Sequence, residues 1–97
     1  MNGKERIAQA FSNAKETQKA ALMPYFTLGY PDLESSLDVI EAIAEDADLL
    51  ELGVPFSDPR ADGPIVQQST QVALENGTTA QKCLDMVKAL RQKGVDT

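Results

Sequence analysis

The stretches ALMPYFTLGYPD at residues 21–32 and LLELGVP at residues 49–55 decide the fold class. Each contains a short apolar or aromatic run that ends at a glycine or proline turn signal, as buried strands do. We therefore predict strands over residues 20–28 and 49–54. Their apolar character suits parallel strands, which are covered on both faces. Pro24 cannot donate a ladder hydrogen bond, so it is expected in the first pairs of its strand or at a bulge.

Helical periodicity fills the rest of the sequence. The expected helices span residues 4–19, follow an N-cap at Asp32, run from Pro64 to a stop at Gly77, and run from a cap at Thr79 to a stop at Gly94. The last helix has an expected apolar stripe of Cys83, Leu84, Val87 and Leu90. Cys83 is interpreted as inert packing on that stripe.

Strands that alternate with helices indicate a parallel α/β architecture. Two parallel strands leave both edges of a sheet bare, and a (β/α)8 barrel, or TIM barrel, needs roughly 250 residues. The 97 residues contain no repeat or linker-like stretch, so residues 1–97 are expected to form one unit. The predicted fold is the amino-terminal part of an incomplete TIM barrel that ends before the third strand.

The composition excludes several functional classes. Fifteen acidic and nine basic residues give a net charge of −6, whereas nucleic-acid binding needs a basic surface. The apolar runs are shorter than the roughly 20 residues of a membrane span, and the amino terminus lacks a signal-peptide core, so a cytoplasmic location is expected. With one Cys and no His, no metal site of the usual zinc type and no Ser-His or Cys-His pair is expected.

Glu51 is the one charged residue inside the second predicted strand. At the carboxyl end of a barrel strand it would face the mouth where such enzymes keep their active sites, and desolvation there would adapt it to proton transfer. Alternatively, Glu51 faces solvent on an edge strand or pairs with a basic residue. The loop at residues 55–63 adds Asp58 and Asp62, which are either turn residues or part of a carboxylate pair with divided roles.

Tyr25 and Phe26 are neighbours on the first predicted strand. Because side chains alternate along a strand, one of them should point into a barrel and the other toward the helices. Either residue could simply belong to the core.

The runs PYFTLGYPD at residues 24–32 and LELGVPFSDPRADGP at residues 50–64 resemble the opening of tryptophan synthase α subunits, and the resemblance continues through ENGTT at residues 75–79. It implies a lyase of tryptophan biosynthesis that cleaves indole-3-glycerol phosphate to indole and glyceraldehyde 3-phosphate by a retro-aldol step without a cofactor. It also implies a partner, the β subunit of an α2β2 heterotetramer, in which pyridoxal phosphate is expected.

The same resemblance implies roles for single residues. Glu51 would be the acid–base residue that shuttles protons at the indole ring and the glycerol hydroxyl. Asp62 would accept the indole N–H hydrogen bond and stabilise the positively charged intermediate. Tyr25 would line the indole pocket, and the loop residues Pro55 and Asp58 would contact the β subunit.

Three departures from the family pattern bear on these implications. Arg60 replaces an apolar side chain, often Leu, and could pair with a neighbouring carboxylate or point to solvent. The AEDAD run at residues 44–48 lacks a glycine that the family usually has before the second strand. The phosphate-binding loops belong to the last strands of such barrels, so residues 1–97 alone are expected to be inactive. The alternative is a non-catalytic chain that keeps only a β-subunit interaction loop.

Overall fold

The computed structural model describes residues 2–56 and 62–97. Within them the elements are α1 (Gly3–Glu16), β1 (Tyr25–Thr27), α2 (Leu33–Ala44), β2 (Glu51–Gly53), α3 (Pro64–Glu75) and α4 (Ala80–Gln92). This is the predicted order of helices and strands, and the architecture is a partial parallel α/β unit. No helix of this part of the chain combines the length and apolar character that a membrane crossing requires.

The strands β1 and β2 pair in parallel, with Tyr25 opposite Glu51 and Thr27 opposite Gly53. Both strands are shorter than predicted. Backbone pairing nevertheless continues outside them, because the Glu51 N–H donates to the Pro24 carbonyl at 3.0 Å and the Leu28 N–H donates to the Gly53 carbonyl at 2.9 Å. Pro24 thus lies directly before the strand and contributes only its acceptor, as its missing N–H required.

The predicted helix starts are confirmed where a side chain caps them. Asp32 accepts the Ser35 N–H at 2.7 Å at the start of α2, and Thr79 accepts the Lys82 N–H at 3.2 Å at the start of α4. Pro64 is the first residue of α3, a position where its missing N–H costs no hydrogen bond. The short polar side chains at the caps therefore set the helix boundaries.

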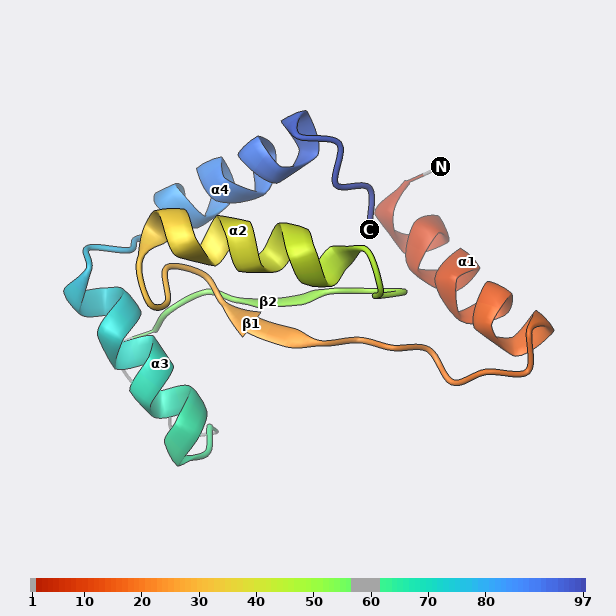
Figure 1. Ribbon diagram of the computed structural model, residues 1–97, viewed down its shortest axis with the longest axis horizontal. Helices are drawn as coiled ribbons and strands as arrows, with labels where there is room; N and C mark the ends of the chain where they lie inside the picture. Colours follow the sequence, from red (N-terminus) through yellow and green to blue (C-terminus); the bar gives the residue numbers. More distant parts are fainter. Residues whose placement is uncertain (1, 57–61) are drawn as a thin grey trace.

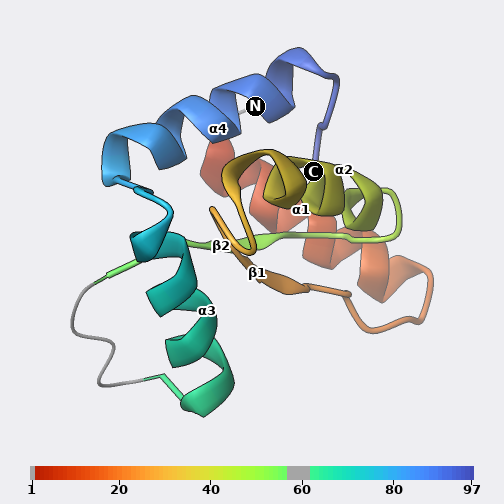
Figure 2. The same ribbon diagram turned by 60° about the vertical axis from the view of Figure 1, so that its left-hand side comes forward.

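Helix α1 lies at the amino ends of the strands, apart from the other helices (Figure 1), and Figure 2 shows the same helix behind α2. It begins at Gly3 because Asn2 and Glu5 form a reciprocal capping box, and it ends at Glu16, earlier than predicted. Its contact with the rest of the chain includes an ion pair between the Arg6 guanidinium and the Asp96 carboxylate at 2.8 Å.

The core lies between one face of the sheet and the helices α2 and α4, which stack on that face (Figure 1). Its buried members are Leu28, Ile40, Cys83, Met86 and Leu90, and Phe26 of β1, Leu52 of β2 and Leu50 just before β2 pack against them. Burial raises the pKa of the Cys83 thiol, which fits inert packing. The predicted stripe of α4 was wrong in one member, since Leu84 is 66% exposed and Met86 is buried in its place.

Within the described residues the other face of the sheet is open around Tyr25 and Glu51, whereas α3 covers it at Thr27. Large apolar side chains that remain exposed near this face or near the strand ends are Ile7, Phe11, Met23, Tyr25, Val54 and Phe56. Exposed apolar residues in such numbers mark a surface that normally packs against other structure. This pattern agrees with the predicted incomplete barrel.

Candidate active site

Tyr25 and Glu51 lie side by side on the open face of the sheet. They are partners in the parallel register, so their side chains project from the same face. Phe26 projects from the opposite face and packs against the core under α2 and α4. The prediction that Tyr25 and Phe26 point in opposite directions is therefore confirmed.

Two expectations for Glu51 were wrong in this structure. Glu51 is the first residue of β2, not a residue at its carboxyl end. Its side chain is exposed, so it does not have the desolvated environment that was expected. The physical reason is that α3 packs on this face only farther along the strands, at Thr27, and that β2 has a bare edge because β1 is the only strand that pairs with it within the described residues.

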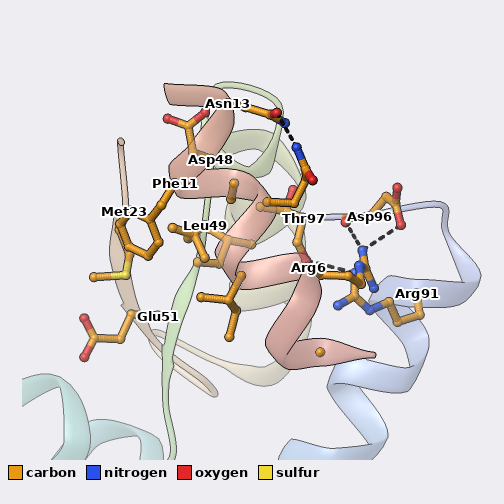
Figure 3. Close-up of a pocket in the computed structure, with 15 residues that line it drawn as sticks. Arg6, Phe11, Asn13, Met23, Asp48, Leu49, Glu51, Arg91, Asp96 and Thr97 are labelled. Carbon is orange, nitrogen blue, oxygen red and sulfur yellow. Dashed lines mark hydrogen bonds and ion pairs between the residues drawn. The ribbon is translucent and has the colours of Figure 1, made fainter. Parts of the chain in front are cut away.

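A hollow of about 680 Å³ lies between α1, the amino ends of the strands and residues 91–97. Phe11, Met23 and Leu49 are among the apolar side chains that line it, and Glu51 lies at its edge, on the side away from the Arg6–Asp96 ion pair (Figure 3). Parallel α/β folds bind ligands at the carboxyl ends of their strands. We therefore interpret the part of this hollow that α1 and residues 91–97 line, away from Glu51, as space at the floor of an open barrel and not as a substrate site.

Asp62 lies two residues before the start of α3, a helix that lies toward the carboxyl ends of the strands (Figures 1 and 2). It is exposed and directly precedes Gly63, the N-cap of α3. The Gln67 side-chain amide donates to the Asp62 carbonyl at 2.7 Å, which ties its backbone to the first turns of the helix. Within the described residues, no hydrogen bond or ion pair joins the Asp62 and Glu51 carboxylates.

The two predicted partner-interface residues fall on the segment that follows β2. Pro55 is half-buried and lies between Val54 and Phe56, whose side chains are 54% and 64% exposed. Asp58 and the atypical Arg60 lie outside the described residues. The structure thus places Pro55 in an apolar exposed stretch.

A line of hydroxyl groups on the open face was not predicted from the sequence. The Thr27 hydroxyl oxygen lies 2.8 Å from that of Ser69 and 3.4 Å from that of Tyr25. A Cβ on Gly53 would lie 1.9 Å from the Tyr25 hydroxyl oxygen, so the Tyr25 ring extends across β2. The period-two spacing of Tyr25 and Thr27 places both side chains on one face and is the sequence signal for this line, although neither residue carries a charge.

Comparison with known proteins identifies the family. The family model described as "Tryptophan synthase alpha chain" matches residues 11–97. The chain is 47% identical over 91 residues to the tryptophan synthase alpha chain of Chloroflexus aggregans, with 93% of this chain and 34% of the relative covered. It is also 47% identical over 90 residues to that of Escherichia coli, with 92% and 34% covered. The chain therefore spans about a third of the length of these curated relatives.

Solved structures agree with this similarity. The tryptophan synthase subunit alpha of Legionella pneumophila superposes with a TM-score of 0.83 at 36% identity, covering 90% of this chain and 34% of that one. A tryptophan synthase structure from M. tuberculosis, in an aminoacrylate-bound form, gives a TM-score of 0.82 at 36% identity, and the match covers 87% of this chain and 35% of that one. These neighbours are TIM-barrel chains, of which the present fold corresponds to a part. The chain belongs to the tryptophan synthase alpha chain family.

Proposed function

We propose that this chain forms part of a lyase that cleaves indole-3-glycerol phosphate to indole and glyceraldehyde 3-phosphate in tryptophan biosynthesis, in the cytoplasm. The observation that carries the proposal is the family match over residues 11–97, which includes both Glu51 and Asp62. The register pair of Tyr25 and Glu51 supports it, because it sets an aromatic ring beside a carboxylate on the open face. Such a pair suits proton transfer to a flat aromatic substrate.

Each carboxylate has its own role in the proposed retro-aldol step. Glu51 delivers a proton to the indole ring and accepts the proton of the glycerol hydroxyl, so that the carbon–carbon bond between ring and side chain breaks. Asp62 accepts a hydrogen bond from the indole N–H and stabilises the positive charge that ring protonation creates. Tyr25 stacks or packs against the ring. The step needs no cofactor from this chain.

The exposed segment after β2 fits a partner surface. Val54 and Phe56 expose apolar side chains on either side of Pro55, and exposed apolar residues are typical of protein–protein contacts. We propose that this segment, together with Asp58, contacts a tryptophan synthase β subunit in an α2β2 heterotetramer. Pyridoxal phosphate belongs to that β subunit, which consumes the indole.

The proposal is tested in a full-length chain in which residues 1–97 replace the matching third of the E. coli relative. Indole release from indole-3-glycerol phosphate is the assay. Glu51→Gln should lower kcat by about 10²- to 10⁴-fold, the usual contribution of a general acid–base group. Asp62→Asn should lower it by about tenfold to a hundredfold, because it removes a hydrogen bond to a charged group. Glu45→Gln, at an exposed carboxylate beyond α2, is the matched control. Full activity of Glu51→Gln would refute the assignment.

A polypeptide of residues 1–97 alone is expected to release no indole, since its Tyr25 and Glu51 side chains face solvent on an open sheet. The exposed Val54 and Phe56 also favour a second candidate, a chain that only binds a β subunit. The two candidates separate in the full-length chimera with and without added β subunit. Binding without any turnover would support the second candidate, whereas turnover that Glu51→Gln abolishes would support the lyase.

A further inference from the structure

A buried hydroxyl contact joins strand β1 to helix α3. The Thr27 and Ser69 hydroxyl oxygens are 2.8 Å apart, and Thr27 is only 3% exposed. The Ser69 hydroxyl also donates to the Val66 carbonyl of its own helix at 3.0 Å. Either hydroxyl can be the donor in the Thr27–Ser69 contact, and the Thr27 hydroxyl also lies 3.4 Å from the Tyr25 hydroxyl oxygen.

Helix α3 has few other polar attachments to the strands near its amino end. The side-chain amide of Asn76, beyond the carboxyl end of α3, donates to the Gly29 carbonyl at 3.4 Å. Toward the amino end, Ile65 is 84% exposed, and Gln67 bonds back to the Asp62 carbonyl and not to the sheet. The Thr27–Ser69 contact is therefore the hydrogen bond between α3 and the strands that lies closest to Asp62 among the described residues.

That position gives the contact a mechanical consequence. Asp62 is tied to α3 through Gln67, and Glu51 is tied to β1 through the backbone pairing of the strands. The placement of one carboxylate relative to the other therefore depends on how α3 is seated on β1. A rotation of α3 about its attachment at Asn76 would move Asp62 without moving Glu51.

We propose that Thr27 and Ser69 are positioning residues that hold α3, and with it Asp62, against the strand pair that carries Glu51 and Tyr25. This inference rests on the proposed function of Glu51 and Asp62. Neither hydroxyl needs to touch the substrate. Their contribution is to the rate of the chemical step, because a small misplacement of a reacting group costs rate more than it costs substrate binding.

The test uses the full-length chimera and removes each hydroxyl with little change in shape. Thr27→Val and Ser69→Ala should each lower kcat by about fivefold, the equivalent of one ordinary hydrogen bond, and should leave KM within about twofold. Thr27→Ser keeps the hydroxyl and should stay near the parent rate. Thr27→Val already breaks the contact that Ser69→Ala removes, and it also removes the contact with the Tyr25 hydroxyl. The double variant should therefore fall no further than Thr27→Val alone. Ser12→Ala, at an exposed serine on α1, is the matched control.

Amide hydrogen exchange of α3 gives a readout that does not require activity. Thr27→Val and Ser69→Ala should speed exchange in α3, whereas Thr27→Ser and Ser12→Ala should not. Unchanged kcat in the active chimera, losses that multiply in the double variant, or unchanged exchange of α3 in both single variants would each overturn the inference. Full activity of Glu51→Gln would instead overturn the proposed function, and the exchange data would still decide whether Thr27 and Ser69 seat the helix.

Discussion

Replacement of Gly29 by alanine gives the sharpest test of how α3 and α4 are joined to the strands. Gly29 follows β1 and has φ of +90°, a backbone conformation that side chains other than hydrogen disfavour. A Cβ at this position would lie 2.0 Å from the Thr78 hydroxyl oxygen and 3.0 Å from the Thr78 Cβ. Thr78 is buried in the connection between α3 and α4 and cannot turn aside into solvent.

Two costs add at Gly29. The left-handed backbone costs a residue with a Cβ about 1–2 kcal/mol, and the overlap with Thr78 adds about 1–3 kcal/mol, as insertion of an extra carbon into a packed site does. The expected loss of unfolding free energy is therefore about 2–5 kcal/mol. Gly94 separates the two costs, because its φ is +92° and a Cβ added there would meet no atom within 4 Å. Gly94→Ala should cost only the backbone part, about 1–2 kcal/mol.

Urea unfolding of the full-length chimera measures both losses. Gly29→Ala should be less stable than Gly94→Ala by about 1–3 kcal/mol. Thr78→Ala in the Gly29→Ala background should recover part of that difference, since it removes the hydroxyl oxygen but leaves the Cβ contact. Equal losses at Gly29 and Gly94 would show that Thr78 gives way freely, and the reasoning from the contact distance would be refuted.

Three further changes test other parts of the structure. Gly53→Ala would bring a Cβ to 1.9 Å from the Tyr25 hydroxyl oxygen, so the ring must move and kcat/KM for indole release should fall about tenfold to a hundredfold; unchanged kinetics would contradict the role of Tyr25. Burial raises the pKa of the Cys83 thiol above its ordinary value, so the folded state favours the neutral thiol. The stability that the neutral thiol contributes is complete below the pKa of the unfolded state and is lost as pH rises through the pKa of the folded state. Unfolding free energies at about pH 8 and about pH 10.5 should therefore fall more steeply for the parent than for Cys83→Ala, and parallel slopes would disprove this. The Lys93–Glu41 ion pair is half-exposed at 3.4 Å, so Glu41→Gln should cost less than about 1 kcal/mol in urea unfolding; a loss several times larger would contradict that estimate.

The features that the sequence predicted well depend on local chemistry. Asp32 and Thr79 cap their helices because a short oxygen-bearing side chain can reach the backbone N–H three residues on. Pro64 opens α3 for the equally local reason that its missing N–H costs nothing there. The alternation of Tyr25 and Phe26 follows from strand geometry alone. Each of these predictions needed only a few neighbouring residues.

The features that the sequence predicted poorly depend on what covers a side chain. Ile7 and Phe11 have the i, i+4 spacing of one helix face, and they are nevertheless 53% and 51% exposed, because periodicity identifies an apolar face without identifying its partner. Glu51 was expected in a desolvated site because it lies in an apolar run, but an apolar run also does not identify what covers the strand, and Glu51 is exposed. Leu84 was assigned to the buried stripe of α4, but the helix turns Met86 toward the core. Small differences in helix rotation of this kind are set by tertiary packing, which a pattern of residue types does not specify.

The two proposed catalytic carboxylates differ in how they are held, and this difference determines where the site is sensitive. Glu51 is fixed by the backbone ladder between β1 and β2, which few side-chain substitutions can disturb. The position of Asp62 depends instead on how α3 is held against the strands. Two contacts hold it there: the hydrogen bond between the Ser69 and Thr27 hydroxyls, and the packing of Thr78 against Gly29. Substitutions at Thr27 and Gly29, which have no part in the chemistry, should therefore alter the Asp62 side of the reaction first. In the proposed site, β2 carries Glu51, and α3, which is anchored separately, positions Asp62. Substitutions at Thr27 and Gly29 should therefore lower kcat even though Glu51 itself stays in place.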